Sequence, residues 1–419
     1  MHLRRLALVL MLAPSPALAT EAFDACAGAA ASQYETGYAE IGRTVAQMDV
    51  ARAIELCSKA LAEDPESVPL QAWLGRAYDA NGESETAANH LEPAAAAGNA
   101  LAQTILGDML IVGEGVSQDM SRGAELLKLA AAAGFAPAQD SLGLSYDYGE
   151  GVEQDYAEAA RWYRRAADQG LPRAMANLGS MYAEGLGLER DIVAASAWYQ
   201  RAADLGDGRA QYFLGQIYEA GEMGAPDYAR AAALYEAAVN QGHAPSANAL
   251  AYLKEAGLGM EKDIDAALAL YQQAADDGFA LAQFNLGLIH EDGTVPENFA
   301  LARQYYRQAA ESGYSDAAAN LGLMYLDGDG GVKDLEKAVL FTRRAADEGN
   351  AIGLNNLGYL HENGIGVAQD VTQARQLYQQ AADLDYEPAI ENLARLDALP
   401  VEPVVKPRVK PYGPSKIAN

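Results

Sequence analysis

Cysteine and histidine are scarce in this chain, and their scarcity limits the chemistry that it can support. Of the five histidines in 419 residues, four lie beyond residue 20, and none has the spacing of a metal site. The sequence also has no nucleophile elbow, phosphate-binding loop or dinucleotide-binding fingerprint. We therefore expect neither a catalytic site nor a bound metal or other cofactor.

Positive charge is scarce as well. The chain has 30 Lys and Arg against 58 Asp and Glu, which gives a formal net charge of −28. This charge repels phosphate backbones and anionic lipids, so the composition disfavours nucleic-acid binding and docking on a membrane surface. A cationic or polar partner fits better. Apolar residues make up 50% of the chain, which supports a large buried core and argues against wholesale disorder.

Beyond its first residues the chain has no apolar run long enough to cross a membrane. Residues 1–19 have the features of a secretory leader: a positively charged start, an apolar stretch and a small-residue cleavage site that ends at Ala19. A membrane anchor is the alternative, but it needs about 20 apolar residues, and Pro14 and Pro16 interrupt this run. We therefore expect export, with cleavage after Ala19.

The two cysteines, Cys26 and Cys57, both lie near the start of the exported chain. An even number of cysteines in an exported protein favours a disulfide. The alternative is a pair of buried free thiols.

Repetition is what this sequence has in abundance. A leucine, in most copies followed by glycine, recurs every 36 residues, with one interval of 35. These central leucines are Leu106, Leu142, Leu178, Leu214, Leu250, Leu286, Leu321 and Leu357. A partial copy centres on Leu393, and a shorter-period relative centres on Leu74. Units of this length cannot bury an apolar face alone, so the period predicts a stack of small supersecondary units.

Each copy predicts two antiparallel helices. In the clearest copy, Ala138, Leu142 and Tyr146 share one helical face, and Gly149 supplies the left-handed residue that ends the helix. A residue suited to N-capping then opens the second helix in all eight copies, at Asp119, Asp155, Asp191, Asp227, Asp263, Asn298, Asp334 and Asp370. Gly143 and the alanines are expected to let the two helix backbones approach closely.

These residues resemble the Sel-1-like repeat, a branch of the tetratricopeptide superfamily, and residues 51–98 resemble a tetratricopeptide unit. The resemblance implies an all-α fold, a right-handed superhelical α-solenoid of antiparallel helix pairs whose first helices line the concave face. Exported members often carry a similar cysteine-bearing cap, which implies pairing of Cys26 with Cys57. The resemblance also implies a periplasmic location, with release into the medium as the alternative.

The repeats and composition divide the chain into five segments. The expected segments are a leader at 1–19, a cysteine-bearing cap at 20–97, eight repeats at 98–385, a capping helix at 386–399 and a disordered, proline-rich basic tail at 400–419. The tail is expected to be a solvated end. The alternative is that it docks on the acidic repeats or on an acidic partner.

In tetratricopeptide relatives, ligand contacts come from first-helix positions two and one before the central leucine, and two and five after it. By this resemblance the groove residues are Asn177, Tyr212, Phe213, Tyr252, Phe284, Asn285, Asn320, Asn356 and Tyr359. Asparagines could bind the backbone of an extended peptide, aromatics could anchor it, and glutamates five positions after the leucine could select cationic side chains. The alternative is that the asparagines bond locally between neighbouring helices.

These features lead to the hypothesis of an exported, non-enzymatic scaffold or adaptor that binds a protein or peptide partner through the concave face. One alternative is a cell-wall-associated enzyme or a peptidoglycan-binding protein. Relatives linked to penicillin binding carry a cysteine pair in each repeat, which this chain lacks. Another alternative is a secreted factor that acts on a host cell.

Overall fold

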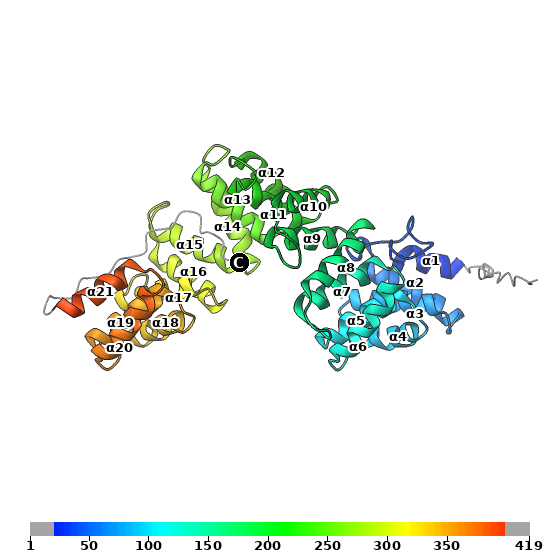
Figure 1. Ribbon diagram of the computed structural model, residues 1–419, viewed down its shortest axis with the longest axis horizontal. Coiled ribbons are helices and arrows are strands. Elements are labelled where there is room, and N and C mark those ends of the chain that lie inside the picture. The colour runs from blue at the N-terminus through cyan, green and yellow to red at the C-terminus, as the bar shows by residue number, and fades with distance from the viewer. Residues whose placement is uncertain (1–20, 399–419) are drawn as a thin grey trace, which may run out of the picture. The chain divides into compact units, whose positions relative to one another are not determined.

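The structure is a computed structural model that describes residues 21–398. The expected leader at 1–19 and the expected tail at 400–419 lie outside the described residues. In the described residues the regular elements are 21 α-helices and one short 3-10 helix, with no strand (Figure 1).

Two compact units make up the described chain, and the boundary falls between Ala210 and Gln211. The first unit contains α1 (Glu21–Ala30), α2 (Val50–Glu63), α3 (Val68–Ala80), α4 (Ser84–Ala96), α5 (Ala100–Val112), α6 (Met120–Ala132), α7 (Ala136–Tyr148), α8 (Tyr156–Asp168), α9 (Pro172–Glu184) and α10 (Ile192–Asp204). Helix α11 (Gly208–Ala220) contains the boundary.

The second unit continues the same alternation of first and second helices. It contains α12 (Tyr228–Val239), α13 (Ala244–Ala256), α14 (Ile264–Asp276), α15 (Ala280–Glu291), α16 (Phe299–Glu311), α17 (Ser315–Asp327), α18 (Leu335–Asp347), α19 (Ala351–Asn363), α20 (Val371–Ala382) and α21 (Glu387–Ala398). Within each unit, successive helices pack against one another, from α1 to α10 and from α12 to α21, which confirms the prediction of an all-α fold built from stacked helix pairs.

Local sequence signals set the helix ends. Gly149 ends α7 in the left-handed region with φ 76°, a conformation that glycine adopts without strain. The N-cap prediction is confirmed in all eight copies, since each predicted side chain accepts a backbone N–H of its second helix. The sixth copy, which is one residue shorter, differs at the end of its first helix. There Asp292, in a right-handed conformation, takes the place of a left-handed glycine.

The glycine after the central leucine faces a side chain of the second helix. A Cβ on Gly143 would lie 2.6 Å from Cδ1 of Tyr163, and that tyrosine is fully buried. The same relation joins Gly179 to Tyr199 and Gly215 to Tyr235. In these three copies the atoms nearest to that Cβ position belong to a tyrosine ring of the second helix. The glycine makes room for an aromatic ring of the second helix, and the ring fills the space between the helices.

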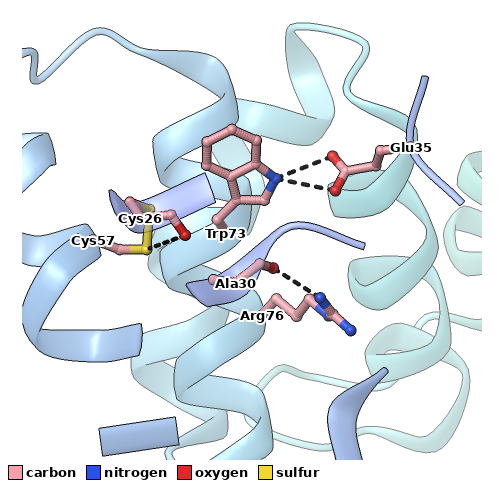
Figure 2. The surroundings of a disulfide bond; sticks show 6 residues. All are labelled: Cys26, Ala30, Glu35, Cys57, Trp73 and Arg76. Atoms are coloured by element: carbon pink, nitrogen blue, oxygen red, sulfur yellow. Dashed lines mark hydrogen bonds between the residues drawn. A yellow bond between two sulfur atoms is a disulfide. The ribbon is translucent and has the colours of Figure 1, made fainter. Parts of the chain in front are cut away.

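A disulfide joins the first two helices. Cys26 of α1 and Cys57 of α2 are bonded with an S–S distance of 2.04 Å, and both are fully buried (Figure 2). This bond confirms the predicted pairing and excludes the alternative of two free thiols. It attaches α1, and the irregular segment that follows α1, to the rest of the cap.

Candidate functional site

The candidate site is the set of side chains two and one positions before, and two and five positions after, the central leucine of each first helix. We call this set the first-helix face. Each unit carries its own stretch of it, and the predicted groove residues are distributed over α9, α11, α13, α15, α17 and α19.

At α3 the first-helix face binds an irregular segment of the same chain, residues 31–42. Arg76, two positions after Leu74, donates hydrogen bonds from Nη1 to the carbonyl of Ala30 at 2.8 Å and from Nη2 to the carbonyl of Arg43 at 2.7 Å. Figure 2 shows the bond to Ala30. Arg76 is 6% exposed; burial lowers the pKa of its guanidinium, and the nearby Glu35 carboxylate opposes that change, while the two carbonyls satisfy its donors. The segment between these two carbonyls, residues 31–42, is not helical.

Trp73, one position before Leu74, contacts the same segment. Its indole Nε1 donates to the two carboxylate oxygens of Glu35 at 3.0 and 3.2 Å (Figure 2). Its ring meets Tyr38 edge-on with 5.0 Å between centroids. Burial raises the pKa of Glu35, and the bonds from Ser32 and Trp73 oppose that rise. Two positions of the first-helix face therefore contact the irregular segment: Arg76 binds carbonyls at its two ends, and Trp73 contacts side chains within it.

Further along the first unit, the face carries a buried charge pair. Asp140, two positions before Leu142, is fully buried and accepts hydrogen bonds from Nε of Arg173 and from Nδ2 of Asn177, the latter at 3.0 Å. Burial raises the pKa of Asp140, while Arg173 and Asn177 favour its ionised form. Arg209 donates to Asn177 Oδ1 at 3.2 Å and so extends the network.

Asp108, two positions after Leu106, is exposed, yet burial among surrounding protein groups raises its pKa to about 7. Ser141 Oγ donates to Asp108 at 3.1 Å. Sequence reasoning did not select Asp108 or Asp140, although both occupy positions used in the resemblance.

The predicted asparagines mainly bind within the fold. Nδ2 of Asn285 donates to Oδ1 of Asn248 at 2.9 Å, and Asn177 makes the equivalent bond to Asp140. Each bond spans 37 residues and joins one copy to the preceding one, which supports the alternative of local pairing for these two residues. Asn320 is 8% exposed. Asn356 differs, because its buried Nδ2 has no partner among the described residues.

The predicted aromatics lie in the second unit, and each is half-buried. Their rings pack against one another and against the core: Tyr212 lies 5.3 Å from His243 and 5.5 Å from Phe213, centroid to centroid, and Phe284 lies 5.0 Å from Tyr314. Tyr252 and Tyr359 also border apolar clusters.

The acidic residues five positions after the leucine have a partner that the sequence analysis missed. A buried tyrosine of the same copy's second helix donates to each of them: Tyr235 to Glu219 at 2.7 Å, Tyr271 to Glu255 at 2.9 Å, Tyr306 to Glu291 at 2.6 Å and Tyr378 to Glu362 at 2.9 Å. The recurrent spacing of acid and tyrosine was the available signal. Glu362 also forms an ion pair with Arg395, so a cation of the chain itself already neutralises its charge.

Residues 21–398 contain neither a metal-binding cluster nor a membrane-spanning helix. No group of three or more His, Cys, Asp or Glu in residues 21–398 is placed to hold a metal ion. No helix in that range combines the length and apolarity needed to cross a membrane.

The repeats match a known family model. Eight consecutive matches to the Sel1 repeat cover residues 100–135, 136–171, 172–207, 208–243, 244–279, 280–314, 315–350 and 351–386. The chain belongs to the Sel1 repeat family. A tetratricopeptide repeat model matches residues 45–107 of this Sel1 repeat protein, over the cap and the first helix of the first copy.

Among solved structures, a Sel1 repeat protein from Oxalobacter formigenes is 31% identical, with 74% of this chain and 90% of that chain covered and a TM-score of 0.57. A protective antigen present in uropathogenic Escherichia coli strains, which displays an SLR fold, is 28% identical, with 87% and 94% covered and a TM-score of 0.45. No curated protein matches the chain. Sel1 repeat proteins generally mediate protein–protein interactions, and their fold is typically a non-catalytic scaffold.

Proposed function

We propose that this Sel1 repeat protein is an exported, non-enzymatic scaffold that binds a protein or an extended peptide through its first-helix face. The observation that carries the proposal is the segment 31–42 on α3. There the face binds irregular backbone through the Arg76 hydrogen bonds to two carbonyls, which lie 13 residues apart in the chain. A partner segment would bind in the same way at later copies, through side-chain donors that bond to its backbone carbonyls.

The second unit offers the chemistry for a cationic partner. Glu255 lies three residues after the half-buried Tyr252 on α13, so the two side chains share one helical face. Burial first, and then the carboxylates of Glu219 and Glu255, raise the pKa of Tyr252. An aromatic surface beside carboxylates suits a lysine or arginine side chain, because the ring covers the aliphatic stem and the acids bind the charge. The net charge of −28 acts in the same direction and speeds encounter with cationic partners.

The disulfide supports the exported location. Disulfides persist in oxidising compartments and are rare in the cytosol. The disulfide and the leader expected at residues 1–19 together favour a periplasmic location. Release into the medium is the alternative.

Affinity capture from an envelope extract, read by mass spectrometry, tests the proposal. The bait is the chain from residue 20, with and without residues 400–419. A triple variant, Tyr212→Ala, Phe213→Ala and Tyr252→Ala, is expected to bind the captured partner at least about tenfold more weakly while its helicity stays intact. The control is Leu129→Ala with Leu340→Ala, two second-helix residues that are 58% and 60% exposed.

Unaltered binding by the triple variant would place the interface outside these aromatics. Loss of the partner together with residues 400–419 would assign recognition to the tail instead. An equal loss in the control variant would show that the effect is not specific to the first-helix face.

A further inference from the structure

Four cationic side chains line one recess of the second unit, in a protein with a net charge of −28. The recess has a volume of about 370 Å³ and lies between α16, the end of α17 and the start of α18. Its cations are Arg303, Arg307, Lys333 and Lys337, and Asp334 is the acidic residue in its lining.

Arg303 is the cation of this cationic recess whose contacts are best defined. Its guanidinium lies over the ring of Tyr325, 3.8 Å from the centroid, and Nη2 donates to the carbonyl of Val332 at 3.1 Å. The ring and the carbonyl fix the position of the guanidinium. Its Nε is buried and has no hydrogen-bond partner among the described residues, so a donor remains unsatisfied there.

The remaining cations are incompletely neutralised. Arg307 and Lys333 are exposed, and neither has an ion-pair or hydrogen-bond partner within residues 21–398. Lys337 pairs with Asp334 at 3.1 Å, and the other oxygen of that carboxylate caps α18. Asp327, the last residue of α17, and Asp329, in the loop that follows it, are not part of the lining. The local charge of the lining is therefore positive.

This concentration of charge is not a feature of every copy. Arg303 lies three residues before Tyr306, the aromatic residue that fills the space between the two helices of this copy. At the equivalent position, earlier copies have Ala160, Ser196, Ala232 and Leu268. The last copy has Arg375, which is paired with Asp397. The corresponding recess of the next copy, about 510 Å³, has one cation, Arg343, beside Asp347 and Asp370.

We infer that the cationic recess binds a soluble small molecule through a tetrahedral oxyanion group, a phosphate or sulfate ester. Guanidinium and ammonium groups are the usual protein ligands of such groups. The volume exceeds that of a bare phosphate, so the rest of the ligand would fill the remainder. At physiological ionic strength, charges beyond about 8 Å are largely screened, so the four local cations outweigh the negative charge of the whole protein. This inference is independent of the function proposed for the first-helix face.

Isothermal titration of the purified protein with inorganic pyrophosphate at about 0.15 M salt, where charges beyond about 8 Å are screened, tests the inference. The double variant Arg307→Gln with Lys333→Gln is expected to weaken binding at least about tenfold, because it removes two unpaired cations. Both residues are exposed, so folding should be unaffected, which circular dichroism checks. The matched control, Arg343→Gln in the next recess, should leave the affinity unchanged.

Absence of binding by the wild-type protein would overturn the inference, as would an equal loss in the Arg343→Gln control, which would indicate diffuse charge. A second arm uses vesicles that contain phosphatidylglycerol. Co-sedimentation that depends on Arg307 and Lys333, together with no pyrophosphate binding, would show that the group comes from a lipid headgroup and would refute the soluble ester.

Discussion

The hydroxyl of Tyr235 donates a 2.7 Å hydrogen bond to Glu219, which lies 16 residues earlier in the chain. The same ring fills the space above Gly215, where a Cβ would lie 2.5 Å from Cε1. One side chain therefore joins α11 to α12 in two ways, through an apolar ring and a polar end. Burial and the adjacent carboxylate raise the pKa of Tyr235, which keeps the hydroxyl protonated and able to donate.

Tyr235→Phe should lower the free energy of unfolding by about 1–2 kcal/mol, because the half-buried Glu219 loses its donor while the ring packing is kept. Urea denaturation followed by circular dichroism measures the change. Tyr148→Phe is the control, since Tyr148 is 68% exposed. Equal stability of the two variants would mean that water replaces the tyrosine hydroxyl without loss.

Removal of the disulfide should destabilise the cap. The bond closes a loop with a sequence separation of 31, for which chain entropy gives a stabilisation of roughly 3–4 kcal/mol. The double variant Cys26→Ala with Cys57→Ala should show this loss in urea denaturation, and reductant should have no further effect on it. Free thiol found in the denatured, unreduced wild-type protein would contradict a stable bond.

Arg76→Met should release the segment between α1 and α2, because the two carbonyls that Arg76 binds lose their donor. Limited digestion with chymotrypsin should then cleave faster after Tyr34 or Tyr38, both half-buried in the native cap. Arg52→Met, at an exposed position of α2, should digest like the wild type. Unchanged cleavage in Arg76→Met would show that the disulfide and Trp73 hold the segment without the arginine.

Stability should depend on Asp108 between about pH 4 and pH 7. Burial raises its pKa to about 7, above the roughly 3.9 of an unfolded chain, so in this window the folded state binds a proton that the unfolded state has released. Its contribution to stability therefore falls as the pH rises through the window. Asp108→Asn should be more stable than the wild type at pH 7 and equal to it near pH 4, as measured by thermal melting. A difference that is the same at both pH values would contradict the raised pKa.

The sequence was most informative where a signal and its effect lie close together in the chain. Gly149 directly follows the last residue of α7 and ends that helix. Asp155 directly precedes the first residue of α8 and caps it. Both effects depend on backbone groups within three or four residues, so they can be inferred from the sequence alone. The period of 36 residues also predicted that the units stack, because the same local signals recur in every copy.

The first-helix face was only partly predictable. The spacing placed Asn285 on that face, but its partner Asn248 lies 37 residues earlier. Either a peptide backbone or a neighbouring side chain could satisfy that amide, and the sequence left both open. The polar segment 31–42 likewise gave no sign that Arg76 would bind carbonyls on either side of it.

The sequence alone therefore determined the helix pairs, their ends, their order and the cysteine pair that the cap could form. The tertiary structure decided which polar groups of the first-helix face are already bonded within the protein and which remain available. The reason is physical: helix formation and capping follow from contacts a few residues apart, whereas the partner of a buried amide or carboxylate depends on which helices packing brings within about 3 Å of it.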